Sequence, residues 1–309
     1  MRKPFLLVRI TVVGILLTTS VGCVVRSRRK VPASMIPPTP QTASADDLIA
    51  RLNAQSERIQ TLTATVDFAP TAGSVYSGVI SEYHDVKGFI LFKKPSMIRI
   101  IGQAPVVRTN IFDMVSEGDE FRLSIPPKNK FIVGKASAER PGKSPLENMR
   151  PQHILDALLV PPVNPDEGHY SFQSVEEGAR RYYILTVFQP GEGHRLFPER
   201  EIWFDRADLH LSRLDLFGPD GATLETVNYS ANHDFDGVPY PTEIKIARPA
   251  EDYSLSISIQ RATFNTDITP DKFELKKPAD AELVEIGARQ LTGAEPRTDW
   301  YGAEAAHGN

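Results

Sequence analysis

Three stretches of the chain gather side chains of the types that bind metal ions or phosphate. Residues 142–144, Gly-Lys-Ser, match the end of a phosphate-binding loop, but Ser137 stands where that loop requires glycine. Residues 205–210 and 232–237 contain Asp and His without calcium-loop or zinc spacing, and their composition favours hairpin turns. The chain also lacks a Gly-x-Ser-x-Gly elbow and a His-Glu-x-x-His motif. We therefore expect no enzyme, no metal site and no cofactor.

Residues 1–22 have the layout of an export signal. Arg2 and Lys3 precede a largely apolar stretch at residues 4–21, in which Arg9 is the only charged residue. An uncleaved membrane anchor is the alternative interpretation, although Arg9 splits the apolar run that a spanning helix needs. Export would place the chain outside the cytoplasm.

Small residues lead from this stretch to Cys23, the only cysteine of the chain. The sequence from Ser20 to Cys23 resembles the lipobox of bacterial lipoproteins, with Ser20 where leucine is usual. In that family a diacylglyceryl group is attached to the cysteine, and the signal peptide is cleaved just before it. The resemblance therefore implies cleavage between Gly22 and Cys23 and attachment to a membrane through a lipid on Cys23.

Residues 23–43 are expected to form the lipidated start of the mature chain and a disordered tether. They contain several cations and prolines and few apolar side chains, a composition that does not fold alone. The cations either contact anionic headgroups or remain solvated. Val24, rather than Asp, follows the cysteine. By analogy with lipoprotein sorting in enterobacteria, this implies the outer membrane of the cell envelope, with the protein facing the periplasm.

The remaining sequence is expected to hold one globular domain at residues 44–288 and a flexible tail at residues 289–309. The formal charge of −4 and the pI near 6.0 argue against nucleic acid as a partner. Two segments have helical character. Ser44 and Asp47 match a capping box, and apolar residues then recur at spacings of three and four. Residues 151–159 begin with a proline suited to a first helical turn.

Most of the domain has the period of two that strands require. We expect strands at residues 88–92, 97–101, 121–125, 181–188, 201–204, 209–217 and 253–259. Short turns rich in Gly, Pro and Asp separate them, so neighbouring strands are expected to pair antiparallel. Roughly a dozen strands and two or three helices predict an α+β domain whose twisted sheet curls and whose helices cover its apolar face.

Several stretches together resemble the lipoprotein-carrier superfamily, which includes LolA and LolB. They are residues 45–52, 59–64, 88–100 with their Lys-Pro turn, 237–244 and 265–273. The resemblance implies a strongly curved antiparallel sheet that forms an open, incomplete β-barrel, closed by two or three helices around an apolar cavity. It also implies acyl chains of lipoproteins or lipids as ligands, and a receptor-like role for a membrane-anchored member. The loop at residues 135–145 and the tail beyond residue 287 have no counterpart in the superfamily.

Candidate lining residues of such a cavity are seven apolar side chains of the predicted strands: Phe89, Leu91, Ile98, Ile100, Leu255, Ile257 and Ile259. Alternation does not distinguish an interior filled by ligand from one filled by the protein's own side chains. Arg99 points to the opposite face from Ile98 and Ile100. It either holds a helix or loop through carbonyl oxygens or is a plain surface cation.

Two functions are therefore open. One is a receptor that binds lipids or lipoproteins in an open cavity. The other is a structural or interaction lipoprotein with a filled barrel whose surface docks a periplasmic protein partner.

Overall fold

The computed structural model describes residues 38–74, 79–82, 86–135, 150–166, 169–191 and 195–286. The predicted signal peptide, Cys23, the Gly-Lys-Ser stretch and the predicted tail lie outside these residues. The chain divides into two compact units, Met1–Pro38 and Thr39–Asn309, and the second contains every helix and strand of the described residues. Within the described part, no helix combines the length and the apolar character needed to cross a membrane.

Helix α2, Ala45–Arg58, begins at the predicted capping box. The Ser44 hydroxyl accepts a hydrogen bond from the Asp47 backbone N–H at 3.2 Å, and the Asp47 carboxylate accepts from the Ser44 backbone N–H at 2.9 Å. Two N–H groups that the helix itself leaves unpaired are thereby satisfied. The helix buries Leu48, Ile49 and Leu52, which form its apolar stripe.

The C-terminal end of α2 is fixed by side chains that are distant in sequence. Lys94, in the Lys-Pro turn, donates to the Ser56 carbonyl oxygen. Asn265 donates to the Arg58 carbonyl oxygen at 2.9 Å and accepts from the Gln60 backbone N–H at 2.8 Å. Free carbonyls at a helix end need such donors. Stretches that carry the superfamily resemblance thus meet at one junction, where they hold the helix against the sheet.

The described strands form one sheet of 15 strands. In chain order they are β1 (Thr61–Ser74), β2 (Val79–Glu82), β3 (Val86–Lys93), β4 (Met97–Gln103), β5 (Asn110–Glu117), β6 (Glu120–Ile125), β7 (Lys130–Lys135), β8 (His169–Glu177), β9 (Arg180–Pro190), β10 (Leu196–Asp205), β11 (Leu211–Phe217), β12 (Thr223–Phe235), β13 (Val238–Arg248), β14 (Tyr253–Phe264) and β15 (Glu282–Ile286). All seven predicted strands are present.

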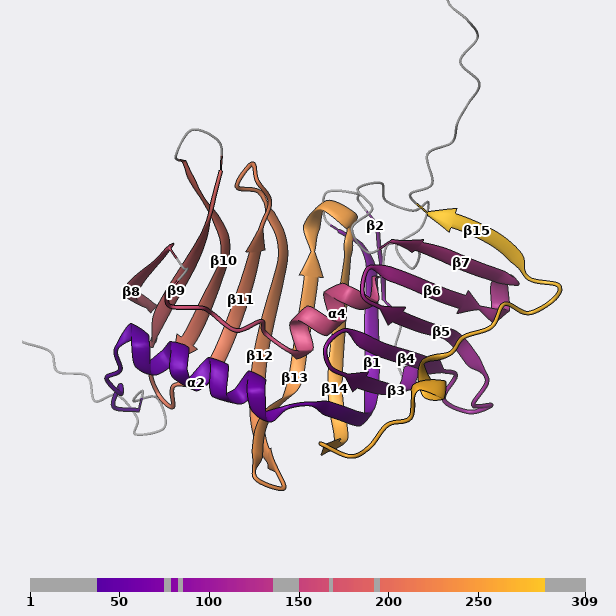
Figure 1. The fold of residues 1–309 in the computed structure, drawn as a ribbon, viewed down its shortest axis with the longest axis horizontal. Coiled ribbons are helices and arrows are strands. Elements are labelled where there is room, and N and C mark those ends of the chain that lie inside the picture. Colours follow the sequence, from indigo (N-terminus) through magenta and orange to yellow (C-terminus); the bar gives the residue numbers. More distant parts are fainter. Residues whose placement is uncertain are drawn as a thin grey trace, which may run out of the picture. The chain divides into compact units, whose positions relative to one another are not determined.

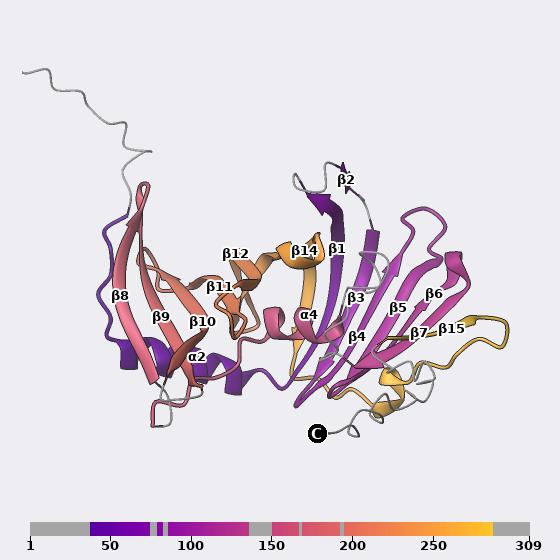
Figure 2. The ribbon, with the colours of Figure 1, turned by 90° about the horizontal axis from the view of Figure 1, so that it is seen from above.

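The sheet follows the order β15-β7-β6-β5-β4-β3-β1-β14-β13-β12-β11-β10-β9-β8, with β2 paired to β1 beside this path. Among the described strands, β15, which pairs with β7, is the only one that runs parallel to its neighbour. The strands β3–β7 and β8–β14 form two antiparallel meanders, which β1 joins by pairing with β3 and with β14. The sheet is curved and does not close on itself, and both described α-helices lie on one side of it (Figures 1 and 2). The predicted open barrel with helices is confirmed.

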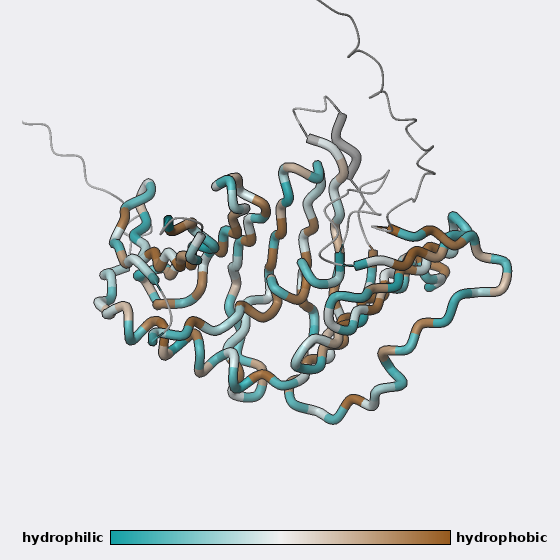
Figure 3. Tube along the Cα trace, turned by 45° about the horizontal axis from the view of Figure 1, so that its top comes forward, coloured by the Kyte–Doolittle hydropathy of each residue, from teal (hydrophilic) through white to brown (hydrophobic). Residues whose placement is uncertain are grey.

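The second described α-helix, α4, covers Pro151–Leu158 and has Pro151 in its first turn, as predicted. It contacts β4, β5 and β13. We call the face that α4 covers the inner face, and the opposite face the outer face. Apolar and polar residues alternate along the strands (Figure 3), as a sheet with one buried face requires.

Three short 3₁₀ turns complete the described elements: η2 (Pro126–Lys128), η4 (Pro249–Glu251) and η5 (Pro270–Phe273). The last of these contacts β4 and β5 on the outer face.

Candidate functional site

Five of the seven candidate lining residues lie together on the inner face. Ile98, Ile100, Leu255, Ile257 and Ile259 are each at most 5% exposed and belong to one apolar core. They come from β4 and β14, two strands separated along the sheet by β3 and β1. The structure thus brings distant parts of the sequence to one surface; that this surface receives a ligand stays a prediction.

Phe89 and Leu91 lie on the outer face, so their predicted orientation is corrected. Phe89 is 39% exposed, whereas Ile90 and Phe92 are 0% and 1% exposed and take the inner positions of β3. Residues 88–92 are apolar on both faces of the strand, so alternation did not determine which face is inside. Gly88 shares the inner face with Ile90, and a Cβ added there would lie only 2.3 Å from the Phe68 ring.

An unbroken row of apolar side chains crosses six neighbouring strands on the inner face. Each member stands opposite the next in the strand register and is at most 2% exposed. We call this set the apolar row: Leu185, Ile202, Leu214, Val227, Ile246 and Leu255. With strands about 4.8 Å apart, the row spans about 24 Å.

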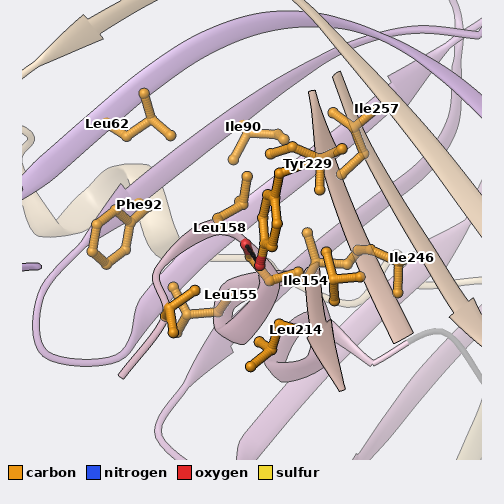
Figure 4. Packing of buried hydrophobic residues seen from close by; sticks show 14 of the residues in the cluster. Leu62, Ile90, Phe92, Ile154, Leu155, Leu158, Leu214, Tyr229, Ile246 and Ile257 are labelled. Carbon is orange, nitrogen blue, oxygen red and sulfur yellow. Dashed lines mark hydrogen bonds between the residues drawn. The ribbon is translucent and has the colours of Figure 1, made fainter. Parts of the chain in front are cut away.

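Helix α4 lies on this inner face through its own apolar side chains. Figure 4 shows the packing of residues from the helix and the sheet: Ile154, Leu155, Leu158, Tyr229, Ile246 and Ile257. Two buried hydroxyls of the sheet reach the last turn of the helix. Tyr229 donates to the Ala157 carbonyl oxygen at 2.8 Å, and Tyr240 donates to the Leu158 carbonyl oxygen. The sheet therefore supplies both apolar contact and hydrogen bonds to the end of α4.

The segment after α4 is held in the same way. Arg200 of β10 donates to the carbonyl oxygens of Pro161 and Pro162, at 3.1 and 2.9 Å. Asn53 of α2 exchanges two hydrogen bonds with the Val163 backbone, at 2.7 and 2.9 Å. Side chains of the sheet and of α2 thus fix the position of α4 and of the segment that follows it.

A small cavity remains between α2, the end of α4 and strands β12 and β13. Its volume is about 30 Å³, and its lining includes Leu52, Ile59, Leu158, Tyr229 and Tyr240. A buried water needs about 10 to 15 Å³ measured in this way, so the cavity has room for about two waters and not for an acyl chain. In this conformation the protein's own side chains fill this part of the inner face.

A row of polar side chains lies beside the apolar row, nearer the ends of the strands. We call it the polar row: Arg200 of β10, Glu225 of β12, Arg248 of β13 and Tyr253 of β14. Arg248 donates to Glu225 at 2.9 Å and to Glu251 at 2.7 Å. All four members of the row are buried, and Glu225 is 0% exposed. Charge at this depth is costly unless it is paired and hydrogen-bonded.

Helix α4 directs two titratable side chains towards this polar row. Burial raises the pKa of Asp156 to about 6, against the lowering effects of a hydrogen bond from Gln152 and of nearby Arg200. Burial lowers the pKa of His153 well below its ordinary value, and the positive charges of Arg248 and Arg150 lower it further. Burial likewise raises the pKa of Glu225 to about 7, although Arg248 opposes this shift. Burial therefore dominates the electrostatics of the cluster.

The same cluster contains most of the buried polar atoms that lack a hydrogen-bond partner. Of the nine such side-chain atoms in the described residues, six belong to α4, the polar row or η4. They are His153 Nδ1, Arg200 Nε, Glu225 Oε1, Arg248 Nε, Glu251 Oε2 and Tyr253 OH. Buried polar atoms are normally satisfied, so such a concentration marks a place where the protein does not complete its own hydrogen bonding.

Arg99 holds the C-terminal segment on the outer face. It donates to both carboxylate oxygens of Asp113, at 3.0 and 2.7 Å, and to the Lys272 carbonyl oxygen at 2.8 Å. The hydrogen bond to Asp113 raises the pKa of Arg99. Of the two interpretations offered by the sequence, the structure supports the one in which Arg99 holds a loop through a carbonyl oxygen.

Each of the two histidine- and aspartate-containing stretches runs from the end of a strand into a hairpin turn, at residues 206–208 after β10 and at residues 236–237 after β12. Asp205 accepts from the Ala207 backbone N–H at 2.8 Å, and Asp234 accepts from the Gly237 backbone N–H at 2.6 Å. Their carboxylates thus serve their own turns. The described residues contain no group of three or more His, Cys, Asp or Glu side chains arranged to hold a metal ion.

The sequence analysis did not identify the polar row, although the sequence carries a signal for it. Arg200 stands two residues before Ile202, and Arg248 two residues after Ile246, so each charge has the strand phase of the apolar residues. Such a charge must face the core. Glu225 has the same relation to Val227.

No protein-family model matches the chain, and no curated protein matches it. Among solved structures it is similar to a DUF1329 family protein from Desulfovibrio piger, with 16% identity and a TM-score of 0.51, over 74% of this chain and 95% of that chain. This likeness concerns the fold.

Two further structures that the chain resembles carry names from the superfamily identified in the sequence. One is a LolA superfamily protein from Nitrosomonas europaea, with 12% identity and a TM-score of 0.46, over 76% of this chain and 99% of that chain. The other is a domain described as an outer membrane lipoprotein-sorting protein from Vibrio parahaemolyticus, with 12% identity and a TM-score of 0.47, over 73% of this chain and 94% of that chain. Structures named for LolA and for lipoprotein sorting are thus among those that this chain resembles, as the sequence predicted.

Proposed function

We propose that the protein binds acyl chains of lipids or lipoproteins on its inner face and acts as a receptor-like lipoprotein. It is anchored through Cys23, at the outer membrane and facing the periplasm. The observation that carries this proposal is the apolar row, which crosses six strands of the sheet. The row lies on the inner face, the face that the short helix α4 covers. No reactive group is needed, because binding rests on the burial of apolar surface.

Helix α4 is the element that can leave the inner face at the smallest structural cost. The strands are held to one another by backbone hydrogen-bond ladders, whereas side-chain hydrogen bonds from Tyr229, Tyr240 and Arg200 hold α4 and its following segment. Each such bond contributes about 1 kcal/mol. An acyl chain that buries about ten methylenes contributes about 8 kcal/mol, which exceeds the contribution of these bonds. The buried side chains of α4, among them Ile154, Leu155 and Leu158, must then pack against the acyl chain in place of the sheet. We therefore propose that the ligand takes the place of α4.

A filled barrel that docks a periplasmic protein is the second candidate function. The specific observation in its favour is the cavity of about 30 Å³, which is far too small for an acyl chain. In that case α4 would be a permanent part of the core.

The two candidates differ in what happens when α4 is loosened. In the chain from residue 23 onward carrying Cys23→Ser, the double substitution Tyr229→Phe and Tyr240→Phe removes both hydroxyls and keeps both rings. We expect faster uptake of a fluorescent fatty acid and more bound lipid by native mass spectrometry. Tyr182→Phe on β9 makes the same chemical change at a tyrosine that packs against Trp203 on the outer face, and should change neither quantity.

A charged inner face should have the opposite effect. Ile257→Glu places a carboxylate at a position that is 0% exposed, and should abolish lipid uptake. Circular dichroism would show whether the variant is folded. Retained uptake by a folded Ile257→Glu variant, together with no gain from the double tyrosine variant, would transfer support to the protein-docking function.

A further inference from the structure

We infer that the polar row is the binding site for the headgroup of an acidic lipid, an oxyanion such as a phosphate that accepts from Arg200. This inference rests on the proposed acyl-chain function and adds the class of headgroup to it. It follows from the position of the row, from the incomplete pairing of Arg200, and from the charge state of the neighbouring carboxyl groups.

The inner face has two chemically different bands. Each member of the polar row lies two residues from a member of the apolar row on the same strand, as in the pairs Arg200 and Ile202, and Arg248 and Ile246. The polar band lies on the side of the hairpins that join β9 to β10, β11 to β12 and β13 to β14 (Figure 1). An amphiphile aligned with the strands would therefore place its headgroup at this rim and its chain on the apolar band.

Arg200 is a buried cation, 8% exposed, that forms no ion pair with any carboxylate of the described residues. Burial lowers its pKa, although Glu199 and Asp156 lie near enough to raise it by a smaller amount. Its two terminal nitrogens donate to the neutral carbonyl oxygens of Pro161 and Pro162, and its Nε has no partner. If the ligand displaces α4 and the segment behind it, these two carbonyls are removed. An oxyanion then restores two parallel hydrogen bonds and also neutralises the charge.

The acids of the cluster oppose an anion less than their number suggests. Asp156 leaves the cluster together with α4, and burial raises the pKa of Glu225 to about 7, so Glu225 loses its charge more readily than an exposed carboxyl group. Arg248 Nε and the Tyr253 hydroxyl are further buried groups without a partner. A headgroup without an anionic group would leave Arg200 buried and unneutralised, which is costly.

The test compares two single-chain lipids with the same acyl chain, lysophosphatidylglycerol and its phosphate-free counterpart monoacylglycerol, and we call both of them lysolipids. Calorimetric titration into the chain from residue 23 with Cys23→Ser, below the concentrations at which the lipids form micelles, gives both affinities. We expect the anionic lysolipid to bind about tenfold more tightly, the effect of one charge-assisted hydrogen bond. Arg200→Gln should remove this preference and leave the affinity for monoacylglycerol unchanged.

Two matched variants and one competitor complete the design. Arg261→Gln on β14 removes the same charge from an exposed position and should keep the preference. Arg200→Lys keeps the charge without the planar fork and should keep only part of the preference. Inorganic phosphate should not compete at concentrations equal to those of the lysolipid.

The outcomes separate the headgroup site from acyl binding. Equal affinities of the wild type for the two lysolipids, or an unchanged preference in Arg200→Gln, overturn the headgroup site and leave acyl binding supported. Competition by equimolar inorganic phosphate also overturns it, because the site would then take the free ion. Binding of neither lysolipid overturns the proposed function itself. If Arg200→Gln does not fold, the wild-type preference and the Arg200→Lys variant decide.

Discussion

The two meanders of the sheet differ in the face on which their buried charged side chains lie. In β3–β7, the buried polar side chain of the inner face is Ser116, and the buried carboxylate Asp113 lies on the outer face, paired with Arg99. In β8–β14, the inner face carries Arg200, Glu225 and Arg248 beside the apolar row. Helix α4 touches both meanders, through β4 and β5 on one side and β13 on the other.

This difference separates two tasks of one sheet. A sheet face whose role is to form a packed core needs only apolar side chains, which exclude water, as in β3–β7. Buried ionisable groups cost stability and are seldom retained without a role. Their concentration in β8–β14, opposite His153 and Asp156 of α4, is the reason why the headgroup proposal assigns recognition to this meander.

The largest effect is expected when one charge of the polar row loses its partner. Arg248→Met removes the cation that pairs with Glu225 and Glu251, and it leaves Glu225 buried without a counter-charge. Breaking a buried pair in this way costs about 3 to 5 kcal/mol of the free energy of unfolding. Urea denaturation measures the change.

The double variant Arg248→Met and Glu225→Met tests the cause of that loss. Replacing both partners by apolar side chains removes the unpaired charge, so we expect most of the lost free energy to return. If the double variant is no more stable than Arg248→Met alone, poor packing of the methionines explains the loss of stability, and the loss of pairing does not.

In the β3–β7 meander the corresponding substitution is a simple truncation. Ile100→Ala removes a side chain that is 0% exposed and packs in the apolar core, at an expected cost of about 3 kcal/mol. Because the loss comes from a cavity, it should be independent of pH between 5 and 8, unlike the effects at the polar row. A pH-dependent loss measured by urea denaturation would break the distinction between the two meanders.

The pH dependence of stability should come from Glu225. Burial raises its pKa from 4.5 to about 7, so this group contributes stability that is complete below 4.5 and is lost as the pH rises through about 7. Glutamine has no proton to lose. The free energy of unfolding of Glu225→Gln, relative to the wild type, should therefore rise by about 2 to 3 kcal/mol between these limits.

His153 provides a control of opposite sign. Burial lowers its pKa below 6.5, so the folded protein loses stability as the pH falls below that value. His153→Gln should therefore gain relative to the wild type on the acid side. Denaturation curves at several pH values give the free energy of unfolding of each variant relative to the wild type. If this difference changes with pH in the same direction for both variants, the assignment of the two groups is wrong.

Much of the fold could be predicted because one face of the sheet is buried. In β14, serines and apolar residues alternate from Ser254 to Ile259, and the strand and its orientation were both predicted correctly. β8 was missed because most of its residues are exposed on both faces, which leaves no alternation to detect. β15 was missed because its parallel pairing with β7 joins segments that are distant in sequence.

The site was harder to predict than the fold because its members meet only in three dimensions. Arg200 and Arg248 belong to different hairpins, and His153 lies on a helix between the two meanders. Their phase along the strands shows that the two arginines face inwards, but their proximity depends on strand register. Similarly, nothing near Arg99 in the sequence shows that Lys272 supplies its carbonyl partner.

The smallest effect is expected at Arg99, the arginine that pairs with Asp113 on the outer face of the β3–β7 meander. Arg99→Gln removes the paired hydrogen bonds to Asp113 and the bond to the Lys272 carbonyl oxygen. The expected cost is about 2 kcal/mol, less than for Arg248, because the Arg99 and Asp113 side chains are 20% and 8% exposed and water reaches this pair more easily. Because these bonds lie on the outer face, the affinity for both lysolipids should stay unchanged. Hydrogen exchange should increase around residues 270–273, which Arg99 holds against β4. A changed lipid preference in this variant would show that the outer face of β3–β7 takes part in recognition, and that the two meanders do not divide the tasks as proposed.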